Sequence, residues 1–394
     1  MRQLQLLIRF TLLSCVLALL CACGANTVRT TTVTPVNKGD PTRPEEELLD
    51  VAVRPFDPGV ERLAEKEILT VPEIREAEAR YMPVVLATTL QGSGHWGAVR
   101  VIPEQTAVSD VIVQGRILKS TGLELELEIT ASDVSGARWY TRRYEGTASR
   151  YSYDSAAGAP ALDPFQDVYN RIANDLAAYR AEIEPRHVRE LRTIAELKFA
   201  TAFSPQAFDG YLDTDRKGIT RIVRLPAESD PMLARVRRIR ERDALFIDTL
   251  QDQYDAFARQ MSRPYQDWRR ETHSEALAYQ EMRRQATLRT VAGIAAIIGG
   301  IAAQGSDNAR TRAAGSVGII GGAVMVKSGM DKREESKMHA ETLKELGASL
   351  GAEVQPRVID LDERRVTLSG TAEEQYRQWR GVLRDIYAAE SGMP

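Results

Sequence analysis

The sequence predicts an α+β protein. A small α/β domain with an antiparallel meander comes first, a mostly helical region with a long antiparallel helical hairpin follows, and a small ββα unit ends the chain. Three observations support this order. Between residues 48 and 155, short alternating apolar runs are separated by glycine-containing turns, which is typical of strands. From residue 231, apolar residues return every three or four positions, which predicts helix. From residue 286 to 329, small residues return every seven positions, which marks one stripe on each of two helices.

The composition sets the broad class of the protein. With 394 residues, 43% of them hydrophobic, and a formal net charge of -3, the chain is long enough for two or three soluble domains with apolar cores. A net charge this close to zero gives no indication of a nucleic-acid partner. All three cysteines lie before residue 24, so we expect no disulfide and no thiolate zinc site in the rest of the chain. No other pattern leads us to expect a metal or a cofactor.

Residues 1–22 form a predicted signal peptide. Arg2 and Arg9 precede or border an apolar run that reaches Leu20, and this order is typical of secretion signals. Leu20-Cys21-Ala22-Cys23 resembles the lipobox of bacterial lipoproteins, in which the signal is cut before a cysteine that carries the lipid. The resemblance implies lipidation of Cys23. Because Gly24 follows in place of an aspartate, it also implies an outer-membrane protein that faces the periplasm. A retained membrane anchor is the alternative.

Residues 23–47 precede the first domain. They are rich in threonine and proline, then acidic, and they show no apolar periodicity. This composition is typical of chain that cannot bury enough apolar surface to fold. We therefore expect a flexible tether between the lipid and the first domain.

The α/β domain is predicted from residue 48 to 155. A strand at 49–53 precedes a helix at 71–90, and strands follow at 97–102, 110–118, 123–131 and 137–145. Leucine or isoleucine alternates with glutamate from Leu123 to Ile129, which is the pattern of a strand buried on one face.

Three short pieces of this domain carry a second resemblance. They are Asp50-Val51-Ala52-Val53-Arg54-Pro55-Phe56, Val113-Gln114-Gly115-Arg116-Ile117 and Asp133-Val134-Ser135-Gly136. Together with the order of elements, they resemble the small α/β domain of periplasmic proteins such as the TolB amino-terminal domain and the curli secretion lipoprotein. The resemblance implies a fold and a role in envelope assemblies, and it assigns no functional residue.

Gly92-Ser93-Gly94-His95-Trp96-Gly97 has the glycine spacing of a dinucleotide-binding loop. Such a loop needs a strand before it and a helix after it, so that the pyrophosphate meets a helix N-terminus. Here the predicted helix precedes and the predicted strand follows. We therefore expect a turn from helix to strand.

Residues 156–263 are predicted to be helical. A break is expected at Glu184-Pro185, and Ser229-Asp230-Pro231 is a strong helix start. Asp213 and Asp215 have the spacing of half a calcium loop, but their context favours a solvated turn. A cluster of five arginines also stands out, and a solvated face is favoured over a site for phospholipid headgroups or an acidic partner. These arginines are Arg235, Arg237, Arg238, Arg240 and Arg242.

The glycine-rich hairpin is predicted from residue 264 to 352, with a kink or restart at Pro264. Its two stripes pair about a turn between residues 307 and 308. Position 286 pairs with 329, 293 with 322 and 300 with 315, because the two members of each pair lie equally far from that turn. The six stripe residues are Ala286, Gly293, Gly300, Gly315, Gly322 and Gly329. Neither apolar arm reaches the ~20 residues that a spanning helix needs. Two interpretations stay open: a close-packed helix pair with no further role, or a glycine zipper that contacts a membrane, a partner or its own copies.

The last segment, 353–394, is predicted as two strands and a helix. Strands at 356–360 and 364–368 precede a helix that runs from Thr371 to about residue 389.

Catalysis finds little support in the sequence. The four histidines are scattered, and no His-Glu-x-x-His, Gly-x-Ser-x-Gly or Walker-type pattern occurs. His273 and Glu275 are two apart on a predicted helix and face different ways, so we expect His273 on the helix surface. The sequence therefore predicts a non-catalytic outer-membrane lipoprotein that acts as a structural or assembly component. The alternatives are a module that binds peptidoglycan or lipid and, less favoured, an envelope enzyme.

Overall fold

The computed structural model describes residues 33–62, 72–102, 109–153, 162–227, 229–303, 354–361 and 364–391. Several sequence predictions lie outside these ranges. They are the signal peptide, the lipidated Cys23, the hairpin turn near residue 307 and the returning arm with Gly315, Gly322 and Gly329.

A five-stranded sheet has the strand order β2-β1-β3-β4-β5. Its strands are β1 (Val51–Val53), β2 (Val99–Val101), β3 (Val111–Ser120), β4 (Glu124–Asp133) and β5 (Arg138–Thr147). β1 pairs in parallel with both β2 and β3, and β3, β4 and β5 form the antiparallel meander that the turns predicted. The α+β fold class is confirmed.

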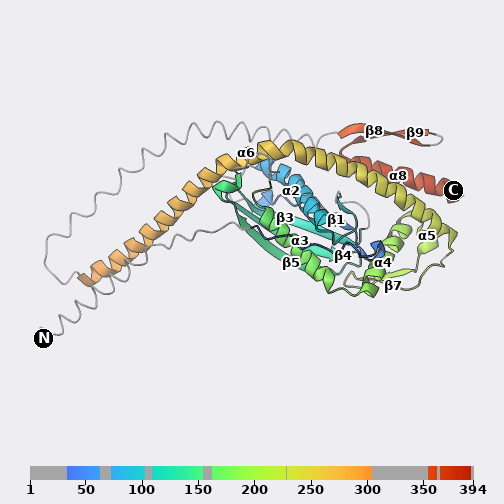
Figure 1. The fold of residues 1–394 in the computed structure, drawn as a ribbon, viewed down its shortest axis with the longest axis horizontal. Coiled ribbons are helices and arrows are strands. Elements are labelled where there is room, and N and C mark those ends of the chain that lie inside the picture. Colours follow the sequence, from blue (N-terminus) through green and yellow to red (C-terminus); the bar gives the residue numbers. More distant parts are fainter. Residues whose placement is uncertain are drawn as a thin grey trace. The chain divides into compact units, whose positions relative to one another are not determined.

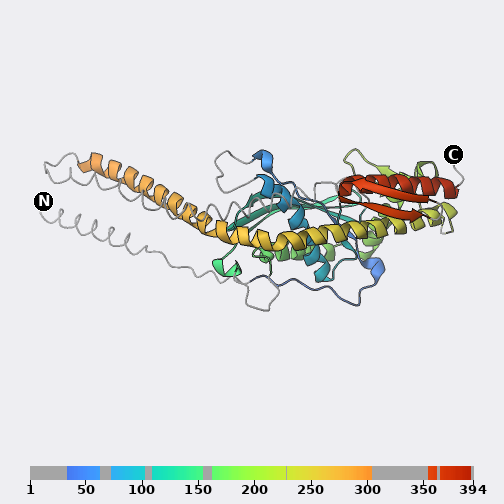
Figure 2. The same ribbon diagram turned by 90° about the horizontal axis from the view of Figure 1, so that it is seen from above.

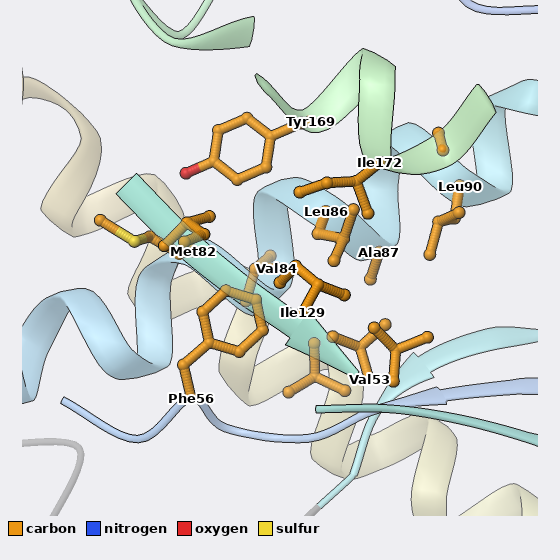
Figure 3. Packing of buried hydrophobic residues seen from close by; sticks show 14 of the residues in the cluster. Val53, Phe56, Met82, Val84, Leu86, Ala87, Leu90, Ile129, Tyr169 and Ile172 are labelled. Atoms are coloured by element: carbon orange, nitrogen blue, oxygen red, sulfur yellow. The ribbon is translucent and has the colours of Figure 1, made fainter. Parts of the chain in front are cut away.

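One face of this sheet is covered by helices α2 (Pro72–Ser93) and α3 (Gln166–Ala181). Along β4 every second residue is buried, from Leu125 to Ala131, because successive side chains of a strand point to opposite faces. Figure 3 shows Ile129 of β4 facing Leu86 of α2 and Ile172 of α3 across this layer. Each such side chain contributes roughly 1.5–3 kcal/mol by leaving water.

A second core forms around helix α4 (Pro185–Phe203) and the elements that follow. The break before Pro185 is as predicted. The short helix α5 (Pro205–Phe208) and the hairpin of β6 (Leu212–Thr214) and β7 (Thr220–Ile222) come next. Leu197 and Phe199 of α4 belong to this core together with side chains from the end of the chain.

The chain ends in the predicted ββα unit. β8 (Val354–Leu361) and β9 (Arg364–Gly370) pair antiparallel, and α8 (Ala372–Ser391) follows. A capping box starts α8: the Thr371 amide donates to the Glu374 carboxylate at 2.8 Å, and the Glu374 amide donates to the Thr371 hydroxyl at 3.2 Å. Trp379 and Leu383 of α8 are buried in the second core.

Helix α6 (Pro231–Ala303) connects both cores. It has 73 residues, and at 1.5 Å per residue it is about 110 Å long. The Asp230 carboxylate accepts the Met232 amide at 2.8 Å and caps its start, as the sequence predicted. Figures 1 and 2 show α6 passing α8 with its first half and α2 with its middle.

Of the kink or restart expected at Pro264, the restart is wrong, because α6 continues through that residue. An interior proline costs ~3 kcal/mol, since it removes one hydrogen bond and crowds the preceding turn. Its neighbours offset this cost: Met261 and Tyr265 are fully buried in the first core, and Trp268 nearly so. The last part of the predicted helical region, from Pro231, and the first arm of the predicted hairpin are thus one helix. The helical backbone of α6 includes Ala286, Gly293 and Gly300.

Candidate functional site

Residues 34–48, which we call the strap, lie against α3 by their main chain. The Thr34 amide donates to the Asp167 carboxylate at 2.8 Å, and the Asn170 side-chain amide donates to the Thr34 carbonyl at 2.7 Å. Asn174 donates to the Pro35 carbonyl at 2.9 Å and accepts the Asn37 amide at 2.8 Å. The three α3 residues lie on one helix face because they are spaced by three and four positions. We call them the α3 ladder.

The far half of the strap is held by α2 and by two arginines. The Gly39 amide donates to the Ser93 carbonyl at 2.8 Å. A Cβ at Gly39 would lie 2.2 Å from the Gly94 carbonyl oxygen, so the close approach requires glycine. Arg180 donates to the Glu47 carbonyl at 2.7 Å, and Arg192 donates to two further strap carbonyls. The expectation of a flexible tether is therefore wrong for residues 34–47.

A groove of about 680 Å³ lies beside the strap, between α2, the start of α3 and α6. Its volume is within the ~300–1,000 Å³ range of small-molecule sites. Val84 and Val85 of α2 and Ala258 of α6 give it apolar walls, while Val36 and Lys38 of the strap form one side. The strap is thus part of a groove that is large enough for a small molecule.

A buried ion pair lies at one end of the groove. Asp163, which lines the groove, accepts two hydrogen bonds from Arg269 at 3.1 and 3.2 Å. Both side chains are at most 3% exposed. The Arg269 guanidinium also lies 3.8 Å from the centre of the Tyr265 ring and 4.8 Å from that of Phe165. Charge pairing and cation–π contact together offset the cost of removing this cation from water.

A second buried ion pair lies within α2, and its carboxylate also contacts α6. Glu78 lies 3.6 Å from Arg75, and both side chains are 1% exposed. The same carboxylate accepts hydrogen bonds from the Ser120 and Tyr265 hydroxyls, so three elements meet at it. Arg75 makes no hydrogen bond, and the ion pair with Glu78 is its charge compensation.

Replacing this carboxylate tests how much α2, β3 and α6 depend on it. Glu78→Gln keeps the shape and the hydroxyl contacts but leaves Arg75 as an uncompensated buried charge. We expect the free energy of unfolding in urea to fall by about 3 kcal/mol or more. Glu76→Gln, on the exposed side of the same turn, should change it by less than about 0.5 kcal/mol. Equal effects of the two substitutions would contradict this assignment.

Aspartates cap the strand ends at one edge of the sheet. The Asp110 carboxylate accepts the Asp50 amide at 2.9 Å, and the Asp50 carboxylate accepts the Ala98 amide at 2.8 Å. Burial raises the pKa of Asp110 to about 6. Arg240 and Asp243 line a cavity of about 70 Å³ beside Asp50. Among the described residues, no group of three or more acidic, histidine or cysteine side chains is placed to hold a metal ion.

The raised pKa of Asp110 predicts a pH dependence of stability. Between about pH 4 and pH 6 Asp110 holds a proton in the folded protein that it lacks in the unfolded chain, so its contribution to the free energy of unfolding should rise as the pH falls through that window. The difference between a pKa of about 6 and the usual 3.8 corresponds to roughly 3 kcal/mol, at 1.4 kcal/mol per unit.

Asp110→Asn keeps an acceptor for the Asp50 amide and removes the charge. We expect it to be more stable than the wild type at pH 7 and to have a flatter profile between pH 4 and pH 6, measured by urea unfolding. Asp213→Asn, at an exposed position of β6, is the matched control. An unchanged pH profile in Asp110→Asn would refute the assignment.

The other candidate residues named in the sequence analysis form turns or pack in the interior. The glycine-rich loop is the predicted turn: α2 ends at Ser93, Gly94 has φ +74°, and β2 follows. Asp215 accepts the amides of Lys217 and Ile219 at 2.8 and 3.0 Å and closes the turn between β6 and β7. His273 is a correction, because it is 6% exposed and contacts the Ala148 carbonyl at 3.2 Å instead of facing solvent.

Two arginines of the α6 cluster form ion pairs with two different helices. Arg237 pairs with Glu196 of α4 at 2.6 Å, and Arg242 pairs with Glu390 of α8 at 3.0 Å. These side chains are 42–54% exposed on the arginine side, which fits the predicted solvated face. Arg237 and Arg242 therefore serve contacts within the chain.

Sequence reasoning missed the α3 ladder. Its signal was present, because a carboxylate and two amides three and four positions apart form a polar stripe beside buried Val168 and Ile172. No sequence pattern, however, indicates which main chain such a stripe binds.

Comparisons with known proteins add little to this picture. No family model matches the sequence, and no curated protein matches it. Among solved structures, protein XCC0632 from Xanthomonas campestris, described with the family model DUF330, is similar at 14% identity and a TM-score of 0.22. The similarity covers 37% of this chain and 90% of that chain, and at this level it carries no functional argument.

Proposed function

We propose that the protein is a non-catalytic lipoprotein of the outer membrane that serves as a structural or assembly component of an envelope complex. The observation that supports the proposal is the short sequence separation between Cys23 and the strap. Ten residues, 24 to 33, separate the lipid-bearing cysteine from the first strap residue. Fully extended, they reach about 35 Å. A lipid on Cys23 would therefore hold the folded domain close to the bilayer.

The long helix α6 supports the assembly role. Its first half is buried in both cores, and the same helix continues into the stretch that holds Ala286, Gly293 and Gly300. No helix of the described residues has an apolar stretch that is long enough to cross a bilayer. We infer that this stretch packs against the returning arm and contacts a partner, a membrane surface or a second copy.

One observation favours a second function. The groove beside the strap has the size and the mixed apolar and polar walls of a binding site. A module that binds peptidoglycan or lipid is therefore the alternative to a purely structural role.

Lipidation is tested by substituting the cysteine. In a Gram-negative host, the wild type should incorporate labelled palmitate and fractionate with the outer membrane. Cys23→Ala should lose both properties, because no other cysteine follows the predicted signal. Cys21→Ala is the matched control: it leaves the acceptor cysteine in place and should retain both. A wild type without label would refute the proposal.

The helix pairing is tested by crosslinking in whole cells. Cysteines placed at Gly293 and Gly322 should form an intrachain disulfide with an added oxidant, since the two positions pair at one level of the predicted hairpin. Dimers formed by the single substitutions would show contact between copies. Ala295→Cys with Gly322→Cys is the control, because position 295 faces away from position 293 on a helix. Equal yields in the two double variants would contradict the pairing.

A further inference from the structure

We propose that the strap is a releasable spacer, whose docking sets how far the folded domain can stand from the membrane. The inference rests on the lipid anchor proposed above. It assigns the α3 ladder, the end of α2 and two arginines to one task. They bind an extended polypeptide, namely the segment that follows the anchor.

The contacts hold the strap by its backbone. Seven hydrogen bonds join strap amides and carbonyls to side chains of α3 and α4 over residues 34 to 48. Each contributes ~0.5–1.5 kcal/mol net. The strap is therefore bound at a defined register, with Gly39 seated against the turn after α2.

The same strap is inexpensive to release, because none of its side chains is buried. From residue 33 to 48 every residue is exposed or partly exposed, and burial begins at Leu49, which is 0% exposed. Ordering the strap also costs backbone entropy, which opposes the gain from its hydrogen bonds. Segments with few buried apolar contacts and exposed hydrogen bonds open at a small fraction of the global free energy. The cores stay folded when the strap leaves.

Release changes the reach of the anchor. With the strap docked, ten residues link Cys23 to the domain, which is about 35 Å at full extension. With the strap released, residues 24 to 48 are free, and 25 residues extend to about 85 Å. Docking also completes the groove, since Val36 and Lys38 form one side of it. A ligand that needs this side would hold the protein in its short state.

Two substitutions release the strap by independent routes. Asn170→Ala with Asn174→Ala removes three of the hydrogen bonds from the ladder. Gly39→Ala leaves α3 intact and places a Cβ 2.2 Å from the Gly94 carbonyl oxygen. Thr193→Ala is the control, because that hydroxyl bonds within its own helix to the Arg189 carbonyl.

The experiment uses the lipidated full chain on vesicles of phosphatidylethanolamine and phosphatidylglycerol that carry an acceptor dye in their headgroups. A donor dye is attached to Arg186→Cys, at a side chain that is 84% exposed on α4. Cleavage after Lys38 by endoproteinase Lys-C reports strap release, because a cut there frees the domain from the vesicle and this enzyme does not cut after Arg29 in the tether. Circular dichroism verifies that each variant stays folded.

We expect both release variants to be cut after Lys38 on the order of tenfold faster, as a loss of ~1.4 kcal/mol of contacts implies. Energy transfer in uncut samples should fall in both variants, and the control should match the wild type. Unchanged cleavage would overturn the inference, and so would faster cleavage with unchanged energy transfer. A wild type that neither carries lipid nor binds vesicles would overturn the proposed function and the inference together, whereas the first two outcomes leave the lipid anchor standing.

Discussion

The burial of one stripe of α6 is the constraint on which the rest of the structure depends. Val236, Ile239 and Leu250 complete the core that holds α4 and α8, and Met261, Tyr265 and Trp268 complete the core under the sheet. Because both sets lie on one continuous helix, the two cores have a shared element. A break at Pro264 would separate the two cores. The burial of Met261 and Tyr265 beside it offsets the cost of a proline inside the helix.

Buried charges add specificity to this packing. Glu78 joins α2, β3 and α6 through an arginine and two hydroxyls, and Asp163 joins the start of α3 to Arg269. Such pairs contribute little net stability against an apolar replacement, but each partner needs the other. They therefore fix which turn of α6 faces which helix, a choice that apolar packing alone leaves open. The groove lies where these helices meet, and Asp163 belongs to both features.

The strap links this arrangement to the proposed location of the protein. A segment without buried side chains is normally expected to be free, yet main-chain hydrogen bonds to the α3 ladder hold it. The bound state is weakly held because the entropy of ordering opposes the hydrogen bonds and no buried apolar side chain adds to them. Weak main-chain contacts suit a segment that docks in one register and can also be released. In the proposal above, this docking sets how far the lipid anchor lets the domain stand from the membrane.

The sequence by itself determined the local structure. Alternation of leucine with glutamate predicted β4, the Asp230-Pro231 start predicted α6, and Thr371 predicted the start of α8, because these signals act within a few residues. Only the tertiary structure decided what lies far apart in the chain. The burial of His273 against Ala148, the continuation of α6 through Pro264 and the binding of the strap to α3 all depend on partners more than a hundred residues away or on the packing around them. Such partners leave no periodic signal in the sequence. The spacing of residues on a helix indicates which side chains share a face, but it does not indicate what that face contacts.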